Sequence, residues 1–137
     1  MVALLVSGVA SFVFDQFSKR AVQSRLATRS LDYPLGLRIH FVASSRLIYG
    51  TSSARAGFML LWIAAALSAL VLMLFTPSFT SGLSQIALGA AFGGAAGNLA
   101  DIVRSQRVVD FVDFGWWPAF NFADVAIIVG LPLALIT

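Results

Sequence analysis

Four stretches of apolar residues alternate with polar segments along the chain. They cover residues 2–17, 56–75, 83–100 and 120–136. A helix that crosses a membrane needs about 20 residues, and fewer where flanking side chains reach the interface. The pattern predicts an all-α membrane protein with four transmembrane helices, in a single domain over residues 1–137. No basic segment precedes the first stretch, so we expect a retained helix there and not a cleaved signal peptide.

The polar segments that join these stretches contain two short runs typical of strands. Residues 37–42 partly alternate between polar and apolar side chains, and residues 108–112 are mostly β-branched or aromatic. Since the first and third connecting segments lie on the same side of a four-helix protein, the two runs predict a small β platform outside the membrane. Residues 21–31 are a candidate for an interfacial helix.

Composition supports the membrane assignment. The chain is 59% hydrophobic and only 11% charged, with a mean hydropathy of +0.91, whereas soluble domains are about 25% charged. The bases flank the apolar stretches, so we expect membrane lipids as partners and no nucleic acid. The chain has no Cys and a single His, which excludes disulfides and makes a structural zinc site improbable. We expect no metal and no cofactor.

All nine Lys and Arg residues lie in the first and third connecting segments or at their borders. The positive-inside rule, taken alone, would place that side of the membrane protein in the cytoplasm.

Two of the apolar stretches carry an Asn followed three residues later by an Asp. Asn98 and Asp101 close the third stretch, and Asn121 and Asp124 open the fourth. Residues three apart share one face of a helix. Because consecutive spans run antiparallel, the two aspartates should lie at a similar depth, where they could face each other.

Ionisable side chains within a membrane span are expensive and usually functional. Two carboxyl groups held close together share a proton, so that one acts as a base and the other as an acid. Such a pair could activate water against a peptide carbonyl without a metal. The alternative is that each aspartate only ends or begins a helix at the interface, where Asp124 would suit the helix dipole.

Other polar residues favour structural roles. Asp15 and Lys19 are four apart and could form an ion pair, which would contribute little if exposed. His40 is expected to be a strand or interface residue. Asp110 and Asp113 are expected in a loop, which Asp110 could organise because apolar residues flank it.

Small residues recur every four positions in the third stretch, which predicts close packing against another helix. The glycines concerned are Gly89, Gly93 and Gly97.

At these residues the sequence resembles the lipoprotein signal peptidase family (signal peptidase II), the membrane aspartic proteases of bacteria. Four blocks resemble the family's motifs Asp-Gln-x-Thr/Ser-Lys, Gly-Asn-x-x-Asp, Val-Val-Asp-Phe and Pro-x-Phe-Asn-x-Ala-Asp, in that order. They are Asp15-Gln16-Phe17-Ser18-Lys19, Gly97-Asn98-Leu99-Ala100-Asp101, Val108-Val109-Asp110-Phe111 and Pro118-Ala119-Phe120-Asn121-Phe122-Ala123-Asp124.

The resemblance implies four helices with a small periplasmic strand platform. It implies cleavage of a lipoprotein signal peptide just before a diacylglyceryl-modified Cys. Asp101 and Asp124 would be the catalytic dyad, and Asn98 and Asn121 would line the site. The resemblance also implies a multi-pass protein of the bacterial inner membrane with its active site toward the outer face, and we follow it over the charge rule because four ordered blocks are more specific.

The chain departs from the family pattern at positions expected to bind substrate. Ser44 stands where the family has Asn in its first periplasmic loop, and Arg46 stands where it has Gly. Ile102 replaces the family's Arg after the first catalytic Asp, and Arg104 lies nearby. We expect Ser44 and Arg104 to contact substrate, and these departures leave the acid–base pair in place.

Three functions from different classes fit the sequence. The first is a monomeric aspartic endopeptidase whose partner is a prolipoprotein signal peptide with a lipidated Cys. The second is a non-catalytic relative that binds lipoproteins or lipidated peptides. The third is a small membrane scaffold or transporter subunit whose aspartates relay protons. The paired aspartates favour the first.

Overall fold

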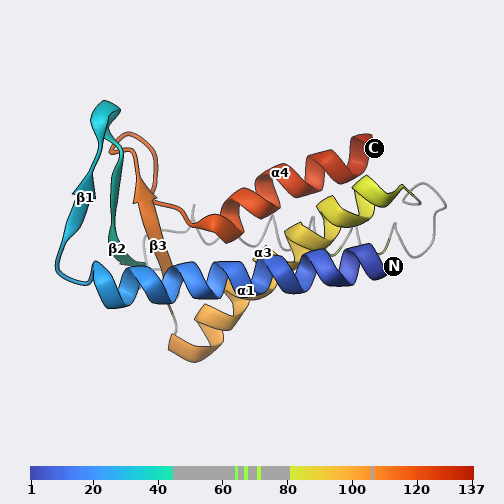
Figure 1. Cartoon of the computed structure of the whole chain (residues 1–137), viewed down its shortest axis with the longest axis horizontal. Helices are drawn as coiled ribbons and strands as arrows, with labels where there is room; N and C mark the ends of the chain where they lie inside the picture. The colour runs from blue at the N-terminus through green and yellow to red at the C-terminus, as the bar shows by residue number, and fades with distance from the viewer. Residues whose placement is uncertain (45–63, 65–66, 68–70, 72–80, 106) are drawn as a thin grey trace.

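The computed structural model describes residues 1–44, 64, 67, 71, 81–105 and 107–137. In this part of the chain, long helices and one antiparallel sheet follow one another in the order α1, β1, β2, α3, β3 and α4. The helices lie side by side, and the sheet stands at one end of them beside the last turns of α1 (Figure 1).

Two of these helices are long and apolar enough to cross a membrane. α1 runs over Val2–Arg25 and α3 over Gly82–Ser105, each with 24 residues. At 1.5 Å per residue each is about 36 Å long, which exceeds the roughly 30 Å of a bilayer core. α4 is shorter, with 15 residues over Phe122–Ile136.

The first helix is longer than the sequence pattern predicted. We expected an apolar span over residues 2–17 and a separate interfacial helix over residues 21–31. Instead α1 continues without a break to Arg25, and β1 begins at Ser30, so the prediction of a second helix was wrong. No Gly or Pro interrupts residues 9–33, so nothing in the chain ends the helix where its apolar character ends.

The predicted second span, residues 56–75, lies outside the described residues except at positions 64, 67 and 71, which are helical. The count of four transmembrane helices therefore remains a prediction.

A small sheet forms from strands of the first and third connecting segments, as the sequence predicted. It has three antiparallel strands in the order β1 (Ser30–Asp32), β2 (Arg38–Ser44) and β3 (Val108–Asp113). A short 3-10 turn over Pro34–Gly36 joins β1 to β2. The register between β2 and β3 shifts between Ile39 and Val42.

α3 lies between α1 and α4, and its small residues permit the close approach. A Cβ at Gly93 would clash with the backbone of Gly8 in α1, and one at Gly94 would lie 2.7 Å from the carbonyl oxygen of Ala123 in α4. The predicted role of the glycine repeat in helix packing is confirmed. Buried apolar side chains of α3 and α4 form the core, namely Ala87, Leu88, Ala91, Ile127, Leu131 and Ala134.

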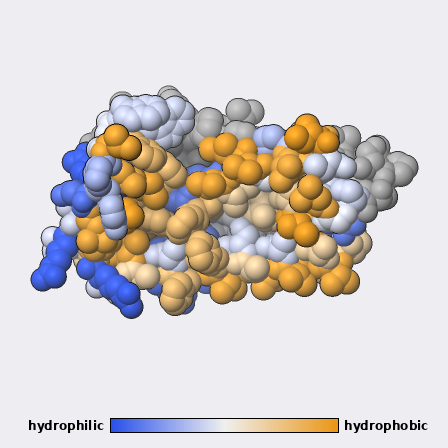
Figure 2. Space-filling model, turned by 45° about the horizontal axis from the view of Figure 1, so that its top comes forward, coloured by the Kyte–Doolittle hydropathy of each residue, from blue (hydrophilic) through white to orange (hydrophobic). Residues whose placement is uncertain are grey.

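α1 has an inverted distribution of polar and apolar side chains. Its three buried residues are all polar: Asp15, Gln16 and Lys19. Large apolar side chains such as Leu5, Val9 and Phe17 are more than half exposed. On the face that Figure 2 shows, hydrophobic residues cover much of the helical part of the molecule, and the most hydrophilic residues gather at the end that carries the sheet. This distribution suits a helix whose outer face contacts lipid and whose inner face serves a polar site.

Candidate active site

A cluster of buried polar side chains lies where α1, α3, β3 and the start of α4 meet. We call it the polar centre, and its members are Asp15, Gln16, Lys19, Asn98, Asp101, Asp110, Asn121 and Asp124. All are buried except Asp124, which is half-buried. Buried polar groups are costly unless each has a hydrogen-bond partner, so their mutual contacts decide what the cluster can do.

Lys19 is the cation of the polar centre. Its Nζ lies 2.6 Å from Asp15 Oδ2 and 2.8 Å from Asp101 Oδ2. It also donates to Asn98 Oδ1 at 2.8 Å. The ammonium has three hydrogens, and these three acceptors can use all of them. With only 2% of its surface exposed, Lys19 holds two carboxylates of two different helices around one charge.

Asp101 receives hydrogen bonds at both of its oxygens. Gln16 Nε2 donates to Oδ1 at 3.0 Å, and the backbone N–H of Val109 donates to Oδ2 at 3.4 Å. The amide of Gln16 is itself oriented by Arg104, whose guanidinium donates to Gln16 Oε1 at 3.0 Å. Asp101 is therefore fixed from α1 and from β3 at the same time.

Asp124 is fixed by the two asparagines. Asn98 Nδ2 donates to Asp124 Oδ1 at 2.9 Å. Asn121 is the N-cap of α4 and forms a reciprocal capping box with Asp124, at 3.0 and 3.1 Å. This arrangement satisfies backbone donors at the start of α4. It places the carboxyl group of Asp124 beside Asn98 at the end of α3.

Asn121 connects the helices to the sheet. Its Nδ2 donates to Asn98 Oδ1 at 3.1 Å, to Asp110 Oδ1 at 3.0 Å and to the Val109 carbonyl oxygen at 3.2 Å. Three acceptors share two hydrogens, so one of the hydrogens is bifurcated or alternates.

Asp15 fastens α1 to the start of α4. Its Oδ1 accepts a hydrogen bond from the backbone N–H of Ala123 at 3.1 Å. A negative charge is favourable at that position because the first N–H groups of a helix lack partners. Gly97 leaves room for this carboxylate, since a Cβ there would collide with Asp15 Oδ2.

The structure brings the two Asn-x-x-Asp pairs into one cluster. Asp101 and Asp124 are connected through Lys19 and Asn98, and Asn121 is completely buried beside them. The geometry is that expected for antiparallel spans with aspartates at matched depth.

Two expectations about the other acidic residues need correction. The ion pair of Asp15 with Lys19 is not an exposed surface pair, because both side chains are at most 3% exposed. Asp110 and Asp113 were expected as loop residues, although the run 108–112 that predicted a strand contains Asp110. Both lie in β3, which extends one residue beyond that run to Asp113. Asp110 is fully buried and contacts Asn121, whereas Asp113 pairs with Arg38 on the sheet at 3.2 Å.

The residues at which the chain departs from the family pattern, or that were expected to contact substrate, lie in different parts of the structure. Ser44 ends β2 opposite Val108, and Arg46 lies outside the described residues. Arg104, in the last turn of α3, contacts Gln16 and through it Asp101.

Gln16 is the one member of the polar centre that we did not single out from the sequence. Its position offered a signal: it is three residues before Lys19, and so lies on the same face of α1. A glutamine on an apolar helix beside two charged residues needs partners, and it finds them in Asp101 and in the carbonyl of Gly97. Among the described residues, no group of three His, Cys, Asp or Glu side chains is placed to hold a metal ion.

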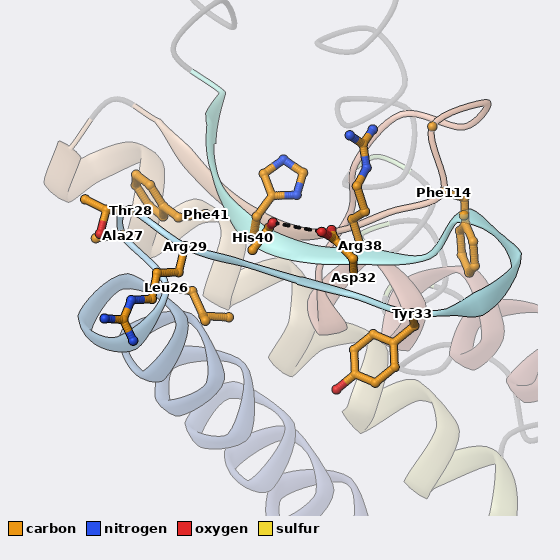
Figure 3. Close-up of a pocket in the computed structure, with 13 residues that line it drawn as sticks. Leu26, Ala27, Thr28, Arg29, Asp32, Tyr33, Arg38, His40, Phe41 and Phe114 are labelled. Atoms are coloured by element: carbon orange, nitrogen blue, oxygen red, sulfur yellow. Dashed lines mark hydrogen bonds between the residues drawn. The ribbon is translucent and has the colours of Figure 1, made fainter.

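A separate cavity of about 720 Å³ opens on the sheet near the end of α1. Arg38 and His40 project from the same side of β2 beside it, and Asp32 accepts a hydrogen bond from Ser30 (Figure 3). His40 is a strand residue, as expected. None of the side chains that line this cavity belongs to the polar centre.

Comparison with known proteins finds one family. Residues 8–137 match the model of signal peptidase (SPase) II. A lipoprotein signal peptidase of Symbiobacterium thermophilum is 31% identical over 94% of this chain and 89% of its own length. One of Syntrophomonas wolfei is 37% identical over 90% of this chain and 84% of its own length.

Solved structures agree with the sequence matches. One bacterial membrane enzyme superposes with a TM-score of 0.76 and 28% identity, covering 99% of this chain and 92% of that one. A second gives a TM-score of 0.71 at 25% identity, covering 99% and 87%. With a family match over almost the whole length and relatives above 30% identity, this chain belongs to the signal peptidase II family.

Proposed function

We propose that this protein is a membrane aspartic endopeptidase that cleaves the signal peptides of diacylglyceryl-modified prolipoproteins. The observation that carries the proposal is the chain of contacts that joins Asp101 to Asp124 through Lys19 and Asn98 within the polar centre. The relatives that the chain matches over most of its length are lipoprotein signal peptidases, which supports the substrate class.

We assign the general base to Asp101. The ammonium of Lys19 lies 2.8 Å from Asp101 Oδ2 and is the counter-charge of that carboxylate. An ionised Asp101 can take a proton from a water molecule. The oxygen of that water then attacks the carbonyl carbon of the scissile peptide bond.

Asp124 then acts as the general acid. The C–N bond breaks as the leaving nitrogen takes a proton from Asp124, and the dyad finishes with one proton, as it started. Asn98 Nδ2 donates to Asp124 Oδ1 and the backbone N–H of Asn121 donates to Oδ2, which fixes the position of the carboxyl group. Proton transfer of this kind typically contributes about 10²–10⁴-fold to a rate.

We expect Arg104 to contact the substrate, and it also positions Gln16. It holds the amide of Gln16 in the orientation that donates to Asp101 Oδ1. Ser44 lies at the end of β2, in line with a role at the entrance to the site. Asp15, Lys19 and Asp110 serve the structure of the centre.

The site lies at the end of the bundle that carries the sheet, so a substrate anchored in lipid could reach it from the membrane surface. We place this end at the outer face of the bacterial inner membrane, with the protein acting as a monomer among membrane lipids. This orientation brings the site to the side on which an exported precursor presents its signal-peptide junction.

A gel-shift cleavage assay in detergent tests the proposal. Purified protein is mixed with a diacylglyceryl-modified prolipoprotein and, separately, with the same precursor lacking the lipid. Wild type should cleave only the lipidated form, and Asp101→Asn and Asp124→Asn should each lose at least the ~10²-fold expected for an acid or base.

Asp32→Asn is the matched control, because Asp32 is an exposed carboxylate on β1 outside the polar centre. It should cleave like wild type. Cleavage that survives in either dyad variant, with wild-type helix content, would rule out the dyad. A folded wild type that binds the lipidated precursor without cutting it would make the protein a binding relative and not an enzyme.

A further inference from the structure

The sheet ends in two neighbouring loops with exposed apolar side chains. One is the turn between β1 and β2, and the other follows β3. We call their exposed residues the apolar tip, namely Tyr33, Leu35, Trp116 and Trp117, which are 49%, 98%, 79% and 51% exposed. A Cβ built at Gly36 would meet the carbonyl oxygen of Phe114 at 3.7 Å, so the two loops touch.

Leu35 is unusual in both its exposure and its backbone. Its φ is +69°, a conformation in which the Cβ of an ordinary residue is crowded. Gly, which adopts it freely, would be the expected residue. A fully exposed leucine in a strained conformation gains nothing from water, and such outliers cluster where function requires them.

The position of the tip indicates what it contacts. The strands run across the direction of the helices, and both loops lie at the same end of the sheet, beyond the outline of the bundle on the side of α4 (Figure 1). The sheet stands beside the last turns of α1, where Arg20 and Arg25 follow the apolar part of that helix. A tip that projects sideways at this level lies over the lipid that surrounds the helices.

The chemistry of the tip fits the lipid–water interface. Tryptophan and tyrosine are enriched at that depth because their rings are apolar with one polar atom. Residues 33–37 and 114–118 contain no charged side chain, so the tip itself can enter the headgroup layer without burying a charge. Arg38, where β2 leaves the turn, is half exposed and is suited to lipid phosphates.

We propose that the apolar tip inserts into the interfacial layer of the same bilayer that the helices cross. The tip is a second point of attachment, separate from the spans, and it holds the sheet at a fixed height and tilt above the polar centre. The partner is the bilayer surface itself and not a second protein, because the spans keep the tip beside lipid at all times.

Site-directed spin labelling tests the insertion directly. The chain has no cysteine, so Leu35→Cys and, in a second protein, Trp116→Cys each give one labelling site. The labelled proteins are reconstituted in phosphatidylcholine nanodiscs. The accessibility of each nitroxide to oxygen, which concentrates in lipid, is compared with its accessibility to a water-soluble nickel chelate.

Two controls calibrate the measurement. Val9→Cys reports lipid contact, because Val9 lies in the apolar part of α1 and is 64% exposed. Thr28→Cys reports water, because Thr28 is exposed in the loop that joins α1 to β1. The ratio of oxygen to nickel accessibility at Leu35 and Trp116 should exceed that at Thr28 several-fold and approach that at Val9.

A ratio at both tip positions equal to that at Thr28 would overturn the proposal. So would insertion that occurs only with anionic lipid, because the contact would then belong to the arginines and not to the tip. Helix content and elution volume verify that each labelled protein is folded. The result does not depend on peptidase activity, so an inactive protein with an inserted tip refutes the proposed function and leaves this inference standing.

Discussion

The polar centre and the apolar tip distribute polar and apolar side chains in opposite ways within the same membrane protein. The polar centre buries carboxylates, amides and an ammonium inside the molecule, where each group depends on a partner from another element. The tip exposes leucine and tryptophan on loops with few contacts. In a soluble protein both arrangements would be errors.

The difference teaches where sensitivity to mutation should lie. A buried charge that loses its partner carries the full desolvation penalty, so single changes in the polar centre should be severe. A side chain in the tip is surrounded by solvent or lipid and not by other parts of the protein. Substitutions there should therefore change the free energy of unfolding only slightly, and by an amount that depends on the medium. The following experiments compare the two regions, from the largest expected effect to the smallest.

Lys19→Met should be the most damaging change outside the dyad. It leaves Asp15 and Asp101 buried without the cation that lies 2.6 and 2.8 Å from them. Breaking a buried pair by removing one partner typically destabilises by about 3–5 kcal/mol. We expect a loss of that size in the free energy of unfolding, measured by thermal or denaturant unfolding in detergent, together with loss of cleavage.

The double variant Asp15→Asn, Lys19→Met separates charge from packing. It removes one negative and one positive charge together, so it should recover part of the lost stability relative to Lys19→Met alone. No recovery would mean that Lys19 acts through its shape and hydrogen bonds, and that the polar centre is not organised around one shared charge.

Asn98→Ala should have the next largest effect. Asn98 joins Lys19 to Asp124 and accepts from Asn121, so its removal leaves two buried polar groups and the half-buried carboxyl group of Asp124 one partner short. An unsatisfied buried group costs about 1–3 kcal/mol, and we expect a loss within that range. Cleavage should fall further than stability does, because Asp124 loses the donor that orients it.

The comparison for Asn98→Ala is Ser24→Ala in the last turn of α1. Ser24 is exposed and donates only to the carbonyl of Ala21 in its own helix. It should unfold and cleave like wild type. An equal loss in both variants would mean that removing any polar side chain from a helix has this effect, and that the network of Asn98 is not its cause.

Much of the fold could be predicted from the sequence because each signal was local. Apolar length predicted α1, α3 and α4, partial alternation of polar and apolar residues predicted β2, and a run of β-branched and aromatic residues predicted β3. The end of α1 was missed because hydropathy falls at Asp15 although the helix does not stop. Hydropathy reports the lipid environment, whereas helix ends depend on caps and breakers, and here none occurs before Arg25.

The candidate site could be predicted in part for the same reason. Spacing of three placed Asn98 with Asp101 and Asn121 with Asp124, and antiparallel spans placed the pairs together. The central role of Lys19 could not be predicted from the sequence. Its contacts with Asp101 and Asn98 join residues that are 82 and 79 positions apart. The spacing of residues in α1 does not show toward which neighbour the Lys19 side chain points. The expectation that the ion pair of Asp15 with Lys19 contributes little, which applies to exposed pairs, therefore underestimated the role of Lys19.

Gly94→Ala tests whether close packing, and not only charge, protects the polar centre. A Cβ there would lie 2.7 Å from the carbonyl oxygen of Ala123 and 3.2 Å from Ala126 Cβ. Overpacking of this kind typically costs about 1–3 kcal/mol, and we expect a loss toward the lower end, read from thermal unfolding in detergent. Gly82→Ala is the control, because a Cβ at Gly82 meets no atom of the described residues within 4 Å; a comparable loss there would contradict the explanation.

Leu35→Gly should have the smallest effect and the opposite sign. Because Gly adopts a φ of +69° without the crowding that Leu35 meets, its substitution should stabilise the protein in detergent by about 1 kcal/mol. Leu35→Asn should gain less, and Leu35→Ile should lose stability because branching at Cβ worsens the crowding. In phosphatidylcholine nanodiscs the gain of Leu35→Gly should shrink, since the leucine side chain then has lipid to contact. Thermal unfolding of the three variants in both media measures these differences, and an equal gain in detergent and in bilayers would mean that Leu35 contacts no lipid.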